Sequence, residues 1–355
     1  MHFAQAACGD PHPRDEAAAT GAKRHAARAS RLLQNVPTPT YPIESGAAMS
    51  PPIDPGAVSP VRTATPASSP VDMTPTTASP RETSAGNAEA AQAIDDARHG
   101  HVPQVEFAGA SFRSLRGQGV IVTGGASGIG AEIVRGFVAQ GCMVGFLDRD
   151  EAAGDALAAG LSGAHFQRCD VADVPALQAA MTTLIARLGG VDVLVNNVGN
   201  DDRHAVEAVT PALFDERIAV NLRPHFFATQ AVIGPMRERG GGCVVNIGSA
   251  SWKNKTLGLS VYATAKSAMS GFTRSLAREL GRDAIRVNCV VPGWVMTQRQ
   301  IDRWLDAAGE AEMTRAQCLD GRIVAGDIAH MGMFLAADTA RMITAQEFVV
   351  DAGWS

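Results

Sequence analysis

The chain has 355 residues, of which 46% are hydrophobic, and it carries a formal net charge of −5 at pH 7. This acidic balance and the scattered basic residues argue against a nucleic-acid partner. No apolar run reaches the roughly 18 residues of a membrane-spanning helix, so we also expect no membrane partner.

Residues 1–104 are predicted to form a disordered tail. They are rich in Ala, Pro, Ser and Thr and almost lack apolar periodicity, so they cannot bury enough apolar surface to offset the entropy lost on folding. The first part of this tail faintly resembles an organelle-targeting peptide, although its acidic residues weaken that interpretation. A start site assigned too early, with the true start at Met49 or Met73, explains the tail equally well.

Residues 105–355 have the size and apolar content of one α/β domain. Short β-branched apolar segments predict strands at residues 120–122, 143–147, 164–169, 191–195, 243–247, 285–291 and 347–350. Segments with helical spacing lie between them, at residues 129–139, 174–188, 212–236, 261–280 and 328–336. Apolar strands that alternate with helices predict a doubly wound, mostly parallel, seven-stranded Rossmann-type sheet. Ligands bind such folds beyond the carboxyl ends of the strands, so the loops there are the candidate site.

The loop after the first predicted strand, TGGASGIG at residues 123–130, is a candidate phosphate-binding turn. Gly124, Gly128 and Gly130 would allow a tight turn and bring a pyrophosphate close to the start of a helix. Their spacing differs from GxGxxG, so that fingerprint is not assigned. An ordinary strand-to-helix turn remains the alternative.

The end of the second predicted strand indicates which cofactor the chain uses. Asp148 follows the glycine turn at a spacing that suits a contact with the adenosine ribose, and its carboxylate would repel a 2′-phosphate. Ser127 in the turn is not basic, which also favours NAD over NADP. Arg149 is the reservation, because an arginine there can accommodate the phosphate. A plain turn role is the alternative for Asp148.

The later loops contain a candidate acid/base pair. Tyr262 and Lys266 are four residues apart, so they would share one face of a helix. A tyrosine with a pKa of about 10 is a poor base at neutral pH, and a neighbouring ammonium group would lower that pKa. Ser249 ends the fifth predicted strand, where its hydroxyl could hold a substrate oxygen. Helix capping is its alternative role.

These motifs, with NNVG at 196–199 and PGWVMT at 292–297, occur in the order typical of the short-chain dehydrogenase/reductase family. The chain resembles that family over nearly all of residues 112–354, with Val198 standing where an alanine is usual. The resemblance implies an oxidoreductase in which Tyr262 transfers the proton, Lys266 binds the nicotinamide ribose and Ser249 orients the substrate. It also implies a relay water held by Asn221, and a homodimer or homotetramer.

The cofactor residues implied by the resemblance include Asp170 and Val171 beside the adenine and Val295 and Thr297 at the nicotinamide carboxamide. The full predicted cofactor set is Gly124, Ser127, Gly128, Ile129, Gly130, Asp148, Arg149, Asp170, Val171, Asn197, Gly199, Tyr262, Lys266, Val295 and Thr297.

Shorter segments narrow the substrate class. NDDRH at 200–204, SASW at 249–252 and QCLDGRI at 317–323 resemble bacterial NAD-dependent D-xylose and L-arabinose 1-dehydrogenases. Such enzymes oxidise the anomeric carbon of a cyclic sugar to a lactone. The predicted substrate contacts are Asn200, Ser249, Trp252, Tyr262 and Trp294. The alternatives are a 3-oxoacyl or other carbonyl reductase, a secondary-alcohol dehydrogenase, or a non-catalytic NAD-binding sensor or scaffold.

Within NDDRH, Asn200 is predicted to lie nearest the substrate, whereas Asp201, Asp202 and Arg203 are predicted to be largely structural. We expect no metal site, because hydride and proton transfer need none. The six cysteines include no CxxC pair. Buried free thiols in a reducing cytoplasm are therefore favoured over disulfides or metal ligands.

Overall fold

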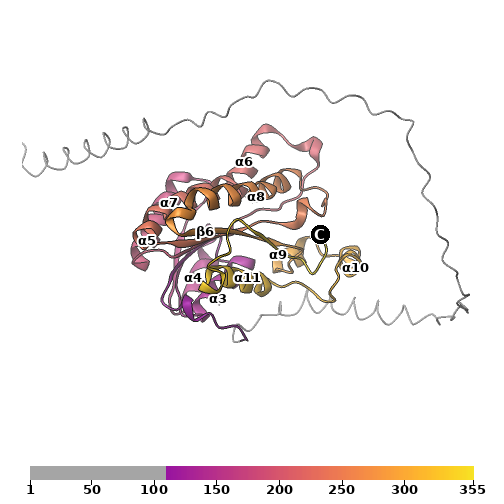
Figure 1. The fold of residues 1–355 in the computed structure, drawn as a ribbon. Coiled ribbons are helices and arrows are strands. Elements are labelled where there is room, and N and C mark those ends of the chain that lie inside the picture. Colours follow the sequence, from indigo (N-terminus) through magenta and orange to yellow (C-terminus); the bar gives the residue numbers. More distant parts are fainter. Residues whose placement is uncertain (1–108) are drawn as a thin grey trace, which may run out of the picture. The chain divides into compact units, whose positions relative to one another are not determined.

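The computed structural model describes residues 109–355 (Figure 1). The predicted tail, residues 1–104, lies outside the described residues, as does the predicted boundary at residue 105, so both stay predictions. Cys142, Cys169, Cys243 and Cys289 are buried free thiols, as predicted, and Cys318 is an exposed one. Within 109–355, no helix combines the length and apolar character that crossing a bilayer requires.

A parallel sheet of seven strands organises this part of the chain, in the order β3-β2-β1-β4-β5-β6-β7. The predicted doubly wound fold is confirmed. The strands are β1 (Gly119–Thr123), β2 (Met143–Asp148), β3 (Ala164–Arg168), β4 (Val193–Asn196), β5 (Gly242–Ile247), β6 (Ile285–Pro292) and β7 (Glu347–Val350). Every residue of β1 and β4 is buried, as expected for central strands covered on both faces.

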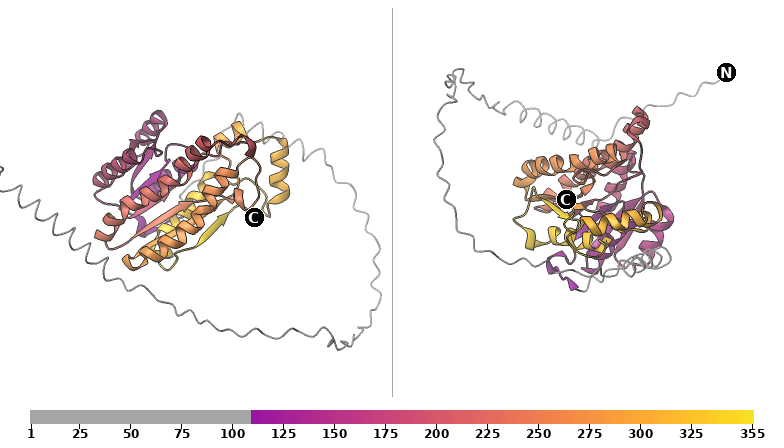
Figure 2. Two further views of the ribbon diagram at one scale, coloured as in Figure 1. Left: turned by 90° about the horizontal axis from the view of Figure 1, so that it is seen from above. Right: turned by 90° about the vertical axis from the view of Figure 1, so that its right-hand side faces the viewer.

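Helices cover both faces of the sheet (Figures 1 and 2). One apolar cluster joins the sheet to α3 (Gly128–Ala139), α4 (Glu151–Ala159) and α11 (Ala325–Ala336). A second cluster joins it to α5 (Val174–Leu188), α7 (Arg223–Glu238) and α8 (Ser260–Leu280). The remaining α-helices of the described residues are α6 (Pro211–Asn221), α9 (Gln298–Arg303) and α10 (Ala307–Ala316). The sequence pattern did not single out α4, α9 or α10.

One predicted helix, residues 212–236, is wrong, because the structure divides it into α6 and α7. The backbone leaves helical geometry at Leu222, where φ is −133° and ψ is −55°. Pro224 follows in the first turn of α7 and has no N–H to donate to a continuous helix. The break leaves Asn221 at the last position of α6, beside the loop after β4.

Strand order reverses between β1 and β4, because the chain passes from β1 to β2 and β3 on one side and continues from β4 on the other. The loops after β1 and β4 therefore diverge at the carboxyl edge of the sheet. Such a switch point is where open α/β sheets bind ligands.

Candidate active site

A cavity of about 920 Å³ lies at the carboxyl ends of the strands. It is lined by loops that follow β1, β2, β3, β4, β5 and β6 and by residues of α9 and α10. The predicted site residues that line it are Gly124, Ser127, Gly128, Ile129, Gly130, Asp148, Arg149, Asp170, Val171, Asn197, Gly199, Asn200, Ser249, Tyr262, Lys266, Trp294, Val295 and Thr297. Asn221 and Trp252 are not among the lining residues. The topology thus gathers nearly all predicted residues into one space.

The glycine turn after β1 is shaped by backbone that only glycine tolerates. Gly124 has φ of +65°, in the left-handed region that side chains disfavour. A Cβ on Gly130 would overlap the carbonyl oxygen of Gly124 and lie 2.6 Å from Nδ2 of Asn197. The turn leads into the N-terminus of α3, where Ser127 is the N-cap and its side chain makes no capping hydrogen bond. Backbone N–H groups and a free hydroxyl therefore suit a pyrophosphate.

Asn197 braces this turn from the loop after β4. Its Nδ2 donates to the carbonyl oxygens of Gly124 at 2.8 Å and Thr123 at 3.1 Å. Its backbone N–H donates to Oγ1 of Thr123 at 3.0 Å. Both N–H groups of the Asn197 side chain are thus bonded to the glycine turn, and they hold the turn in shape.

Asp148 stands at the end of β2, on the edge of the cavity. Its Oδ2 accepts from the backbone N–H of Ala126 at 3.1 Å, and its Oδ1 accepts from that of Asp150 at 3.1 Å. Each carboxylate oxygen keeps acceptor capacity for a ribose hydroxyl. Arg149 lines the same cavity, so a carboxylate and a guanidinium group are both available there.

Lys266 is buried at the floor of the cavity, with only 3% of its surface exposed. Its Nζ donates to the carbonyl oxygen of Ile247 at 2.8 Å and to that of Val198 at 3.4 Å. An ammonium group has three donors, so one remains for a ribose hydroxyl. Burial lowers the pKa of Lys266 to about 8, while the charge of Asp201 acts in the opposite direction.

Tyr262 lies one helical turn before Lys266 on α8, and Nζ of Lys266 is 6.0 Å from the centre of the phenol ring. Burial raises the pKa of Tyr262, and the charge of Asp201 raises it further. A hydrogen bond with Ser249 and the charge of Arg299 lower it. The pKa of Tyr262 is therefore raised and not lowered as expected, because loss of solvent outweighs the opposing effects.

Ser249 caps the short 3-10 helix Ala250–Trp252, and its Oγ accepts from the backbone N–H of Ser251 at 3.2 Å. It therefore combines the capping role with a place beside the phenol. Asn221 is fully buried, and its side chain forms reciprocal hydrogen bonds with the backbone of Asn200, at 2.7 and 3.1 Å. The side-chain amide of Asn221 thus holds the loop after β4.

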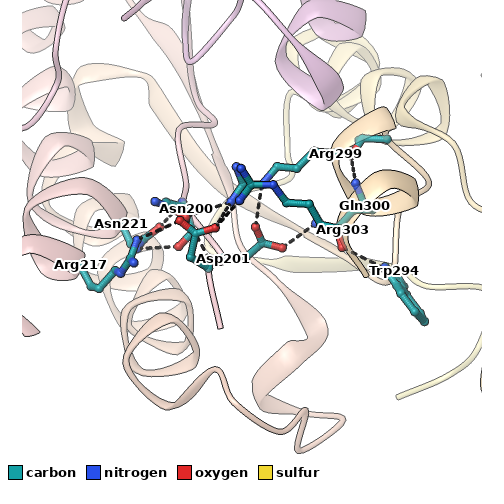
Figure 3. A network of polar contacts seen from close by, with 10 residues as sticks. Asn200, Asp201, Arg217, Asn221, Trp294, Arg299, Gln300 and Arg303 are labelled. Carbon is teal, nitrogen blue, oxygen red and sulfur yellow. Dashed lines mark hydrogen bonds and ion pairs between the residues drawn. The ribbon is translucent and has the colours of Figure 1, made fainter. Parts of the chain in front are cut away.

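A network of ion pairs joins the loop after β4 to α9 (Figure 3). Arg299 donates from Nε to Oδ1 of Asp201 at 3.2 Å and from Nη2 to Oδ1 of Asp202 at 2.6 Å. Asp202 also pairs with Arg303 at 2.8 Å and with Arg217 at 3.6 Å. Burial raises the pKa of Asp202, but a hydrogen bond with Asn200 and the three arginines outweigh it and hold that pKa below its usual value.

Asn200 lines the cavity, and its predicted place nearest the substrate stays a prediction. Its Oδ1 accepts from Nη2 of Arg299 at 3.1 Å and from the backbone N–H of Asp202 at 3.0 Å, so the side chain belongs to the network. Asp201 and Asp202 join the loop after β4 to α9 through ion pairs, and Asp201 also lines the cavity. His204, in the loop after β4, lies beside the first residue of α8, with its Nε2 3.1 Å from Oγ of Ser260.

The four tryptophans are divided differently from the prediction. Trp252 is 36% exposed and lies outside the cavity lining, with Nζ of Lys253 4.5 Å from its ring centre. Trp294 lines the cavity, as predicted. Trp304 and Trp354 also line it, although sequence reasoning missed them. The one indication in the sequence was that all four tryptophans lie in the predicted domain.

Arg299 and Gln300 are further lining residues that sequence reasoning missed. They follow PGWVMT directly, but their partners lie 97 to 99 residues earlier in the chain. No local pattern predicts such contacts.

Comparisons with known proteins agree with this geometry. Residues 118–307 match the family described as short chain dehydrogenase. A D-xylose 1-dehydrogenase of Caulobacter vibrioides (strain NA1000 / CB15N) is 50% identical over 249 residues, 69% of this chain and 98% of that protein. A Rhizobium meliloti (strain 1021) protein named "Probable galactose dehydrogenase GalD" is 42% identical over 247 residues, 68% of this chain and 96% of that protein.

Two solved structures share the fold. A blue fluorescent protein from a metagenomic library, in complex with NADPH, is 34% identical, with a TM-score of 0.64 over 68% of this chain and 99% of that one. A 7α-hydroxysteroid dehydrogenase complexed with NADH and 7-oxo glycochenodeoxycholic acid is 29% identical, with a TM-score of 0.65 over 68% of this chain and 96% of that one. Structural relatives therefore bind nicotinamide cofactors of both kinds.

Proposed function

The chain belongs to the short-chain dehydrogenase family and is an oxidoreductase, and from this premise we propose that it oxidises an aldose at its anomeric carbon with NAD. A pentose such as D-xylose or L-arabinose is the proposed substrate and a lactone the product. One observation carries the proposal: a chain 50% identical to a D-xylose 1-dehydrogenase brings Ser249, Tyr262 and Lys266 together at one cavity.

The proton chemistry is assigned to Tyr262. The deprotonated phenolate oxygen of Tyr262 takes the proton of the anomeric hydroxyl, while Ser249 hydrogen-bonds that same hydroxyl oxygen. Because the pKa of Tyr262 is raised by burial, the phenol is neutral at neutral pH, and oxidation is expected to accelerate as pH rises. Lys266 holds the ribose side of the site with its remaining N–H donor. The cofactor, when bound, supplies the hydride acceptor.

The proposed preference for NAD rests on Asp148. Its carboxylate is held at the cavity edge by two backbone N–H groups, so it cannot easily turn away from a 2′-phosphate. Replacement of Asp148 by alanine is expected to lower the ratio of kcat/KM for NAD to kcat/KM for NADP by about tenfold, which corresponds to about 1.4 kcal/mol. Activity with both cofactors measures that ratio. An unchanged ratio would show that Asp148 does not discriminate.

The activity itself is tested by NADH formation across D-xylose, L-arabinose, D-galactose, L-fucose and L-rhamnose. Saturable turnover of at least one pentose is expected. Binding of NAD without turnover of any sugar, alcohol or ketone would instead identify a sensor or scaffold. Turnover confined to ketones or 3-oxoacyl compounds would identify a carbonyl reductase.

A further inference from the structure

Gln300 stands on the cavity wall with its backbone fixed by the start of α9. Thr297 is the N-cap of this helix, and its side chain accepts from the backbone N–H of Gln300. Gln300 lines the same cavity as Tyr262 and Ser249. Its side chain is therefore carried on a capped helical turn in the wall of the cavity.

Both ends of the Gln300 amide are oriented by partners of opposite kinds (Figure 3). Nε2 donates to Oδ2 of Asp201 at 2.6 Å, and Oε1 accepts from Nε1 of Trp294 at 3.0 Å. If the amide rotated by half a turn, its N–H groups would face the N–H of Trp294 and its oxygen would face the carboxylate of Asp201. Neither pair could form a hydrogen bond. Asp201 is itself held by Nε of Arg299 at 3.2 Å. These partners thus fix one orientation of the amide.

This orientation leaves a defined hydrogen-bonding capacity. A glutamine amide has two N–H donors and two acceptor lone pairs, and the protein uses one of each. One donor and one acceptor remain, in the plane of the amide. Two neighbouring hydroxyls of a sugar offer a matching acceptor and donor. The Asn200 amide differs, because its Oδ1 accepts from both Arg299 and Asp202 and so leaves no acceptor to pair with its Nδ2 donors.

We propose that Gln300 is the specificity-determining residue that binds two neighbouring hydroxyls of the aldose, with Asp201 and Trp294 setting its orientation. This assignment rests on the proposed aldose dehydrogenase function. Trp294 has a second role, because its ring lines the cavity beside the amide and offers an apolar face to the C–H side of the sugar. A substrate with a single hydroxyl satisfies only part of this arrangement.

The test combines variants with deoxysugars. Steady-state kinetics compare wild type, Gln300→Leu and Trp294→Phe on D-xylose and on its 2-deoxy, 3-deoxy and 4-deoxy analogues. Gln300→Leu is expected to lower kcat/KM for D-xylose by about 10- to 100-fold, largely through KM. Its effect should shrink to less than threefold on each deoxysugar that lacks one of the two bound hydroxyls. Trp294→Phe keeps the aromatic face and frees the amide, so a loss of about three- to tenfold is expected.

Gln167→Leu is the matched control, because it removes an amide from β3, outside the cavity. It should leave kcat/KM unchanged, and thermal unfolding checks that every variant is folded. If Gln300→Leu fails to fold, Gln300→Asn and Trp294→Phe provide the same comparison.

The outcomes separate the two proposals. If wild type oxidises D-xylose and Gln300→Leu stays within twofold of it, or loses equally on all the deoxysugars, the assignment of Gln300 is overturned while the aldose function stands. If wild type oxidises no aldose, both are overturned.

Discussion

On the cofactor side of the cavity a glycine turn shapes the wall through its backbone, whereas on the other side hydrogen bonds between charged and polar side chains shape it. Gly124 and Gly130 shape the first wall through a positive φ and a close backbone contact. Asp201, Arg299 and Gln300 build the second through hydrogen bonds between side chains. Added atoms should therefore disturb the first wall most, whereas loss of a charge or a change of pH should disturb the second.

The largest expected effect is a loss of turnover on substitution of Tyr262. Tyr262→Phe removes the hydroxyl to which we assign proton transfer and leaves the ring, so turnover should fall by about a thousandfold or more. NAD binding, followed by titration, should stay within about twofold of wild type. A comparable loss of NAD binding would show that the phenol serves the cofactor wall rather than proton transfer.

On the backbone wall, Gly130→Ala places a Cβ against the carbonyl oxygen of Gly124 and Nδ2 of Asn197. The turn must open, which should abolish measurable NAD binding and lower the free energy of unfolding by about 1–3 kcal/mol. Titration with NAD and denaturant unfolding measure the two effects.

Gly271→Ala in α8 is the matched control for this change, because a Cβ there meets nothing within 4 Å. It should bind NAD normally and be at least as stable as wild type, since alanine favours helices. If the two variants behaved alike, the close contact at Gly130 would not explain the glycine.

On the side-chain wall, Arg299→Met removes the bonds to Asp201, Asp202 and Asn200 while keeping much of the aliphatic volume. KM for the sugar should rise about tenfold, with the dissociation constant of NAD unchanged. Arg303 and Arg217 still pair with Asp202, so the loop after β4 should remain folded.

Arg341→Met is the surface control for the loss of a guanidinium group, since Arg341 is exposed and does not line the cavity. An unchanged KM for the sugar in Arg299→Met, or an equal weakening of NAD binding, would contradict the division into two walls.

The smallest expected effect is a shift of the pH profile. The charge of Asp201 raises the pKa of both Tyr262 and Lys266. Removing it in Asp201→Asn should lower both values, so the rise of the oxidation rate with pH should move to lower pH. A shift of less than about one unit is expected, because Asp201 is only a secondary contributor. A shift to higher pH in measured profiles of kcat would reverse the assigned sign.

Much of the site could be predicted from neighbouring residues. The turn at 123–130, the Tyr262–Lys266 spacing and the apolar strands each depend on contacts a few residues apart, which a sequence displays directly. The helix break at Leu222 was also visible in principle, because Pro224 stands next to it. The prediction missed it by following apolar periodicity alone.

The substrate wall could not be predicted in the same way. Nothing local distinguishes Trp252 from Trp304, yet only Trp304 lines the cavity. Asn200 looked free in sequence, but Arg299, 99 residues later, occupies its Oδ1. The raised pKa of Tyr262 likewise reflects burial and the charge of Asp201, neither of which its own helix reveals.

Local sequence alone therefore determined the parallel α/β fold, the glycine turn and the Tyr262–Lys266 spacing on one helix, because short-range geometry is set by backbone preferences and helical spacing. Only the tertiary structure decided which polar side chains remain available to a substrate. Hydrogen-bonding capacity depends on every neighbour in space, and here the deciding neighbours lie nearly a hundred residues apart.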